Sequence, residues 1–245
     1  MPELLVLEHT DAAGPSAFTE VLEGRKPLVP WRSVDVPAGE ALPDHLDEVA
    51  GLLVLGGTMS AVDPRTHGWM PRELGLLEQA VANEVPVFGV CLGAQLLGEA
   101  LGGDVRRRAV PEVGYLALTR TAAGREDEVV AGWPDGARAA FVHEDEVSTL
   151  PPGAVTLLTG SDGDAAWRLG SALAVQFHPE VTGDQLAGWL DNGLLDHILE
   201  RAGTDPAVFA GEARRRERFV VPLGRALFGR FVDGPVRERV AAIEG

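Results

Sequence analysis

Cys91 is the only cysteine in the chain, and the residues around it suit a nucleophile. The apolar run at 85–90 predicts a strand, and the pattern after Cys91 predicts a helix that ends at Gly102-Gly103. Gly89 and Gly93 permit the sharp strand-to-helix turn that makes the central side chain project. The start of a helix also favours the thiolate, the nucleophilic form. A buried core cysteine is the alternative, and the flanking glycines argue against it.

A nucleophilic cysteine needs a base, and His178-Pro179-Glu180 follows a second strand-like run at 171–177. Residues two apart on an extended segment point to the same side, so His178 and Glu180 can face one cleft. A surface or packing role is the alternative for a lone histidine. We predict a triad of Cys91, His178 and Glu180, in which the carboxylate orients the imidazole and the imidazole accepts the thiol proton.

Three further segments contain residues that could contact a substrate. Gly56-Gly57 ends an apolar run at 51–56, where a glycine amide can approach a carbonyl oxygen, although a tight turn is the simpler interpretation. Gln95 lies one helical turn after Cys91 and either faces the same cleft or hydrogen bonds within the core. The acidic run at 143–146 is by itself typical of a solvated loop.

Four segments together resemble the class I, or triad-type, glutamine amidotransferases. They are LLVLGGTMSAVD, GVCLGAQ, HEDEVSTLPPGAVTLLTGSD and AVQFHPEVT. The resemblance runs from about residue 3 to residue 190 and is strongest to free-standing members similar to the amidotransferase domain of GMP synthetase. It implies that a cysteine thioester forms on the amide of glutamine or of a γ-glutamyl compound, with no cofactor.

The same resemblance assigns roles to individual residues. It implies an oxyanion hole made of the Gly57 and Leu92 amides, and a set of substrate-binding residues: Gly56, Gln95, His143 and Asp145. We expect no metal site, because the histidines and acidic residues lack a recognised ligand spacing.

Two positions depart from the family pattern. Thr58 stands where proline is common, and Glu144 stands where related enzymes often have glycine. We expect the Glu144 carboxylate to lie at the rim of the pocket and to disfavour the α-carboxylate of free glutamine.

The elements that position these residues alternate between strand and helix over 1–190, which predicts a doubly wound, mostly parallel α/β sheet with helices on both faces. Strands are expected at 4–7, 33–36 and 51–56, and a helix at 72–83. Residues 183–245 are expected to be almost wholly helical, interrupted at Gly193, Gly203 and Gly234. We therefore predict an amidotransferase domain at 1–190 and a helical C-terminal extension at 191–245.

Composition restricts the partners. The net charge of −16 argues against binding to nucleic acid or to an anionic membrane surface. No segment is long and apolar enough to span a membrane, the N-terminus has no signal-peptide pattern, and a single cysteine suits the cytoplasm. These features predict a cytoplasmic protein.

Three functions remain open at this stage. The chain could be a glutaminase subunit that delivers ammonia to a separate synthetase, because it has no P-loop of its own. It could be a self-sufficient hydrolase of γ-glutamyl amides. It could also be a non-catalytic binding module, against which the intact Cys-His-Glu set argues.

Overall fold

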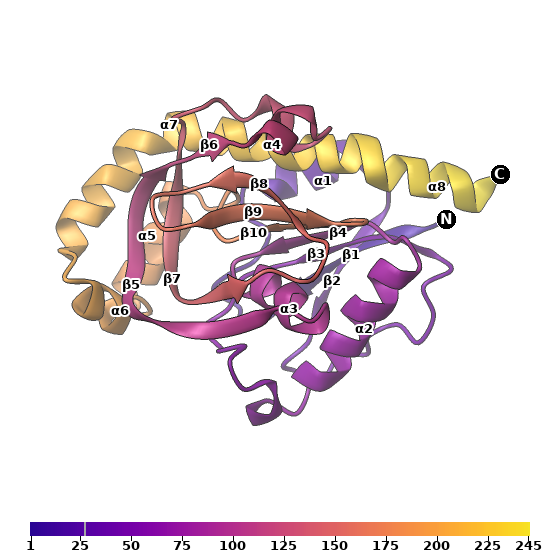
Figure 1. The fold of residues 1–245 in the computed structure, drawn as a ribbon, viewed down its shortest axis with the longest axis horizontal. Coiled ribbons are helices and arrows are strands. Elements are labelled where there is room, and N and C mark those ends of the chain that lie inside the picture. Colours follow the sequence, from indigo (N-terminus) through magenta and orange to yellow (C-terminus); the bar gives the residue numbers. More distant parts are fainter. Residues whose placement is uncertain (27) are drawn as a thin grey trace.

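The computed structural model describes residues 1–26 and 28–245 and is built around an eight-stranded sheet (Figure 1). The strand order is β2-β1-β3-β4-β10-β9-β8-β6, with parallel pairing from β2 to β10 and antiparallel pairing beyond. The strands of this sheet are β1 (Glu3–Glu8), β2 (Trp31–Asp35), β3 (Val49–Val54), β4 (Val87–Val90), β6 (Thr119–Arg120), β8 (Val155–Thr159), β9 (Asp164–Leu169) and β10 (Ala172–Val175). The predicted mostly parallel α/β sheet is confirmed.

A second, two-stranded antiparallel sheet was not predicted. It pairs the long strands β5 (Asp104–Ala117) and β7 (Arg138–Thr149), whose register shifts between Arg107 and Glu112. In Figure 1 this ribbon stands beside the large sheet, near α5 and α6. It matters for function because β7 contains the acidic run at 143–146.

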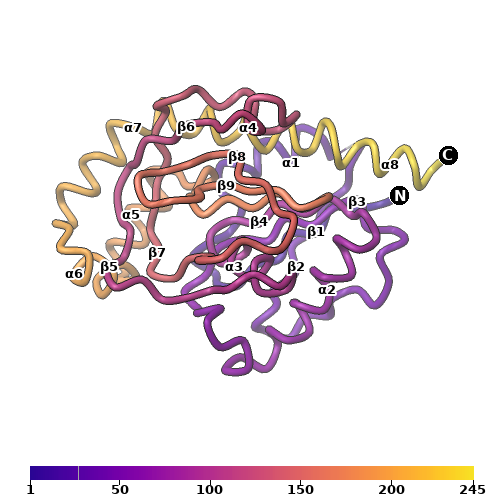
Figure 2. Tube along the Cα trace, viewed as in Figure 1, coloured from indigo at the N-terminus to yellow at the C-terminus, as the bar shows by residue number. Residues whose placement is uncertain are grey.

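The helices are placed on both faces of the large sheet, as Figure 1 shows. Their bounds are α1 (Phe18–Arg25), α2 (Met70–Ala82), α3 (Leu92–Ala100), α4 (Ala122–Glu126), α5 (Gly183–Asp191), α6 (Asp196–Ala202), α7 (Pro206–Phe231) and α8 (Arg237–Glu244). Short 3₁₀ turns lie at Pro64–Thr66 and Val130–Gly132. The trace in Figure 2 places both ends of the chain at the right-hand side of the view.

Side-chain alternation along the central strands divides the core into two layers. In β3, Leu53 packs on the face that α1 and α7 cover, whereas Leu52 and Val54 pack on the face that α2 and α3 cover. Successive residues of a strand point to opposite faces, so a strand that is apolar throughout is buried on both sides. Every residue of β3 is indeed buried.

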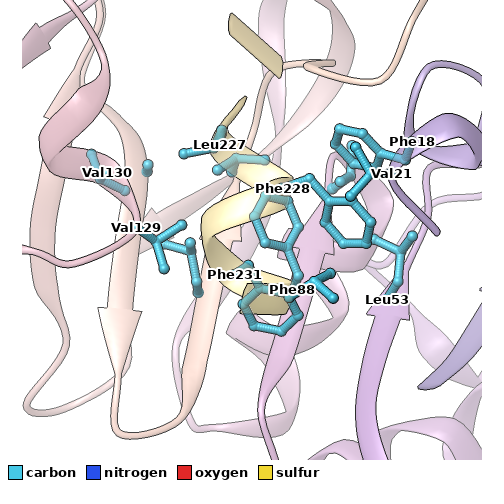
Figure 3. Close-up of a cluster of buried hydrophobic side chains, with 14 of the residues drawn as sticks. Phe18, Val21, Leu53, Phe88, Val129, Val130, Leu227, Phe228 and Phe231 are labelled. Carbon is cyan, nitrogen blue, oxygen red and sulfur yellow. The ribbon is translucent and has the colours of Figure 1, made fainter. Parts of the chain in front are cut away.

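The C-terminal region is helical, as predicted, and contributes to the core. Figure 3 shows Phe228 and Phe231 of α7 packed around Phe88 of β4 and Phe18 of α1. Gly193 separates α5 from α6, and Gly203 ends α6 in the left-handed conformation at φ 63°. At the third expected interruption the helix continues through a π-helical turn, Val232–Val236. The division at residue 190 stays a prediction.

The topology creates a crevice at the carboxyl ends of the parallel strands. From β1 the chain moves to β2 on one side and then returns to β3 on the other. At such a switch point the two connecting loops diverge, and open α/β sheets bind their ligands there. The predicted triad and the Gly56-Gly57 pair follow β3, β4 and β10, at this same edge.

Candidate active site

Cys91 occupies a strained turn between β4 and α3. Its backbone has φ 52° and ψ −104°, an unusual conformation for a residue with a side chain. A Cβ at Gly93 would overlap the carbonyl oxygen of Val54, and one at Gly89 would lie 2.7 Å from the carbonyl oxygen of Gly93. Only glycine fits these two positions, which explains the sequence pattern around the thiol. The Cys91 amide donates to Val175 at 2.9 Å and so ties the turn to β10.

His178 and Glu180 follow β10 and lie beside this turn. The Nδ1 of His178 donates to a Glu180 carboxylate oxygen at 2.7 Å, and both residues are buried. The His178 amide donates to Ala140 at 2.8 Å, which fixes the segment against β7. The edge of the Trp189 indole also packs against the ring, at 5.5 Å between centroids. The structure therefore brings the three predicted triad residues together.

The electrostatics of this cluster favour a protonated His178. Burial disfavours the charged imidazolium, but the nearby Glu180 carboxylate and Cys91 sulfur favour it and outweigh the effect of burial. Together they hold the pKa of His178 well above its ordinary value. An imidazolium beside a thiol stabilises the thiolate, the form that acts as a nucleophile.

Gly56 and Gly57 lie directly against the predicted catalytic residues. A Cβ at Gly56 would lie 3.1 Å from Cε1 of His178, and one at Gly57 would lie 2.8 Å from Cδ2 of Leu92. Leu92 is the first residue of α3, so its amide has no acceptor within the helix. Thr58, the residue that departs from the family pattern, lines the same cleft.

The other predicted binding residues form a hydrogen-bonded network on one wall of the cleft. Gln95 Nε2 and His143 Nδ1 both donate to the backbone oxygen of Asp145, at 2.7 and 2.8 Å. The Asp145 carboxylate accepts from Ser60 Oγ and from Arg107 Nε. Gln95 thus makes the core hydrogen bond that was its alternative role, and contact of these residues with a substrate stays a prediction.

Glu144 is paired with two arginines. Its carboxylate contacts Nη1 of Arg201, from α6, and lies 3.6 Å from Nη1 of Arg107, from β5. Sequence analysis missed both partners, because they lie 57 and 37 positions away along the chain. The carboxylate lines the cleft, but its charge is largely compensated.

The cleft has a volume of about 250 Å³, and one side of it is lined by residues of α5, of α6 and of the loop between them. Its apolar wall is made of Trp189, Leu194, Leu195 and Ile198, with His197 nearby. None of these side chains was predicted as a site residue.

Within residues 1–26 and 28–245, no cluster of three or more histidine, cysteine or acidic side chains could hold a metal ion. No helix in the described part of the chain is long and apolar enough to cross a membrane.

Comparison with known proteins agrees with the resemblance seen in the sequence. Residues 27–196 match the family described as glutamine amidotransferase class-I. The chain belongs to this family. The glutamine amidotransferase-like protein YfeJ of Salmonella typhimurium is 35% identical over 147 residues, which are 58% of this chain and 59% of YfeJ.

Two further matches cover more of the chain. The glutamine-hydrolysing GMP synthase of Thermus thermophilus is 30% identical over 218 residues, which are 80% of this chain but 41% of the synthase. The crystal structure of a glutamine amidotransferase from Thermotoga maritima aligns with a TM-score of 0.83 at 26% identity, covering 95% of this chain and 99% of that one. The chain therefore spans less than two thirds of YfeJ and of the synthase, whereas it matches the Thermotoga protein end to end.

Proposed function

We propose that this protein hydrolyses the side-chain amide of glutamine, or the γ-amide of a γ-glutamyl compound, through a thioester on Cys91. The observation that carries the proposal is the strained turn that holds Cys91 against His178, whose ring is fixed by Glu180 at 2.7 Å. A structural cysteine needs neither the strain nor the oriented histidine.

The reaction proceeds in two acyl transfers. The Cys91 sulfur attacks the amide carbon, the C–N bond breaks, and His178 gives its proton to the departing amine. His178 then accepts a proton from water as the water attacks the thioester, which releases the γ-carboxylate and restores the thiol. Glu180 keeps the imidazole oriented and stabilises its charge throughout.

The amides of Gly57 and Leu92 hold the oxygen that becomes negative in both steps. The two residues come from neighbouring elements, Gly57 from the loop after β3 and Leu92 from the first turn of α3, and this supports the proposal. A single donor of this kind contributes about 2.7–4 kcal/mol to the transition state. No resident metal or cofactor enters these steps.

The family relationship supports a supply of ammonia to a second polypeptide. The match to the Thermus GMP synthase covers 41% of that protein, so the rest of the synthase lies outside the match. By this hypothesis a cytoplasmic synthetase partner accepts the ammonia, and neither nucleic acid nor a membrane takes part.

One observation favours a second candidate, hydrolysis of a γ-glutamyl amide without any partner. His178 must lie beside the departing amine, and Trp189, which packs against His178, begins the apolar wall of the cleft. A substrate with an apolar amine could fill this space, whereas ammonia could not.

Turnover by the purified protein tests these proposals. Glutamine and a γ-glutamyl anilide are supplied separately, and glutamate release is measured for the wild type and for Cys91→Ser. Glutamate from either substrate, lost in Cys91→Ser, supports the mechanism, and a preference for the anilide supports the second candidate. If neither substrate is cleaved and a glutamine-derived chloroketone still labels Cys91→Ser, the proposed nucleophile is wrong.

A further inference from the structure

His9 and Glu73 form a buried pair for which the mechanism has no use. His9 follows β1, Glu73 lies in the first turn of α2, and neither has more than 1% of its surface exposed. The Nε2 of His9 lies 3.0 and 3.1 Å from the two carboxylate oxygens of Glu73. Burying such a pair rarely stabilises a fold, because apolar side chains of similar volume do as well or better. A positional role is therefore the more informative explanation.

The other ring nitrogen points to the loop that contains Gly57. Nδ1 of His9 donates to the backbone oxygen of Leu55 at 3.1 Å, and the Leu55 amide donates to Leu7 at 3.0 Å. Both backbone groups of Leu55 are thus held, one by β1 and one by the imidazole. With Nδ1 bonded to Leu55 and Nε2 within hydrogen-bond distance of the Glu73 carboxylate, the ring is fixed from both sides.

Leu55 is the last residue before the two glycines. Its carbonyl lies in the same rigid peptide plane as the Gly56 amide, so His9 sets the orientation of that plane. The next plane contains the Gly57 amide, and glycine on both sides lets it rotate more freely than any other pair of residues. His9 also lies beside Gly57, because a Cβ added at Gly57 would lie 2.9 Å from the Cβ of His9.

Trp69 covers the pair from the side of α2. Its indole stacks on the His9 ring with 5.3 Å between centroids and an angle of 30°. The imidazole is therefore held by the backbone of the loop after β3, a helix carboxylate and an aromatic face. Such a rigid support matches what a preorganised oxyanion donor requires.

We propose that His9 and Glu73 are positioning residues that fix the Leu55–Gly57 loop so that the Gly57 amide faces Cys91. Neither side chain touches the reacting atoms. The inference rests on the proposed function only for the role of the Gly57 amide, whereas the ordering of the loop can be measured without a substrate.

Two double variants separate the two hydrogen bonds of the ring. In His9→Asn with Glu73→Gln, the asparagine amide takes the place of Nδ1 and can still donate to Leu55. In His9→Gln with Glu73→Gln, the longer amide takes the place of Nε2 and reaches position 73 but not Leu55. Both variants are uncharged at the two positions, and Glu73→Gln alone is their common reference.

The first measurement is hydrogen exchange of the backbone amides at 56–58, which needs no substrate. We expect the asparagine variant to match the reference, and the glutamine variant to exchange at least tenfold faster. If the glutamine variant does not fold, His9→Gln alone replaces it, because its amide can donate to the retained Glu73. Equal exchange in the asparagine and glutamine variants would overturn the inference.

The second measurement compares turnover with alkylation. Loss of a positioned oxyanion donor lowers kcat about 10²–10³-fold. We expect a fall of at least tenfold in the glutamine variant, little change in KM, and less than threefold loss in the asparagine variant. Alkylation of Cys91 by iodoacetamide needs the thiolate but no oxyanion hole, so its rate should be the same in both. A parallel fall in alkylation would show general damage to the site and refute the positioning role.

Absence of turnover in the wild type would count against the proposed function alone, and the exchange comparison would still decide this inference.

Discussion

The backbone strain at Cys91 predicts that a glycine in its place gives a more stable protein than an alanine. Both substitutions remove the thiol, and they differ only by one methyl group. At φ 52° and ψ −104° a residue with a Cβ is strained. We take the strain energy to be about 3 kcal/mol, the upper end of the usual range, and glycine avoids it. Two effects reduce this advantage of glycine over alanine. The greater entropy of glycine in the unfolded chain lowers it by about 1 kcal/mol, and the missing buried methyl group lowers it by about 0.8 kcal/mol.

The net expectation is that Cys91→Gly exceeds Cys91→Ala in free energy of unfolding by about 1 kcal/mol, or about 2–4 °C in Tm. Urea unfolding followed by circular dichroism measures the difference. Ala226→Gly provides the control, because Ala226 is an exposed residue of α7 and the same change there should cost about 1 kcal/mol. If glycine is no more stable than alanine at position 91, the turn is not strained and our account of the elbow is wrong.

Three further predictions concern the cleft. His178→Ala should lower kcat about 10²–10⁴-fold, whereas Glu180→Gln should leave measurable turnover, and equality of Glu180→Gln with the wild type would contradict its orienting role. The pKa of His178, followed by NMR titration of the ring, should fall both in Cys91→Ser and in Glu180→Gln, because each partner raises it; an unchanged pKa in both variants would refute the charge coupling. Glu144→Gln removes a negative charge from the lining of the cleft and leaves the positive charges of Arg107 and Arg201 less compensated, so kcat/KM for free glutamine should rise about fivefold at low salt, and a fall would show that the carboxylate itself binds substrate.

Local patterns predicted the parts of the site that depend on nearby residues. The turn at Cys91 was recognisable because the glycines that permit it lie two positions away on either side. His178 and Glu180 were recognisable for the same reason, since an extended segment places both side chains on one face. The central strands were predicted because a strand buried on both faces is apolar throughout.

The parts that were missed depend on contacts between distant segments. The pairing of β5 with β7 shifts register along its length, and no local pattern encodes such a shift. Glu144 had the composition of a solvated loop, yet it is paired with Arg201, 57 positions away. In the same way, His9 and Glu73 are 64 positions apart, and each alone is an unremarkable polar residue beside a strand or within a helix.

Two parts of the cleft come from different segments of the chain. The residues of the proposed mechanism lie in short, local turns after β3, β4 and β10, which any member of this fold with the same glycines can form. The apolar wall of the cleft, which would face the departing amine in the proposed mechanism, comes instead from α5, α6 and the loop between them, through Trp189, Leu194 and Ile198. Because this wall and the turns are encoded by separate segments, substitutions in α6 can change which amine is accepted while leaving the strained cysteine and its histidine intact. If the proposed mechanism holds, substitutions in residues 189–201 change the preference for the amine, and substitutions around Cys91 change the reaction itself.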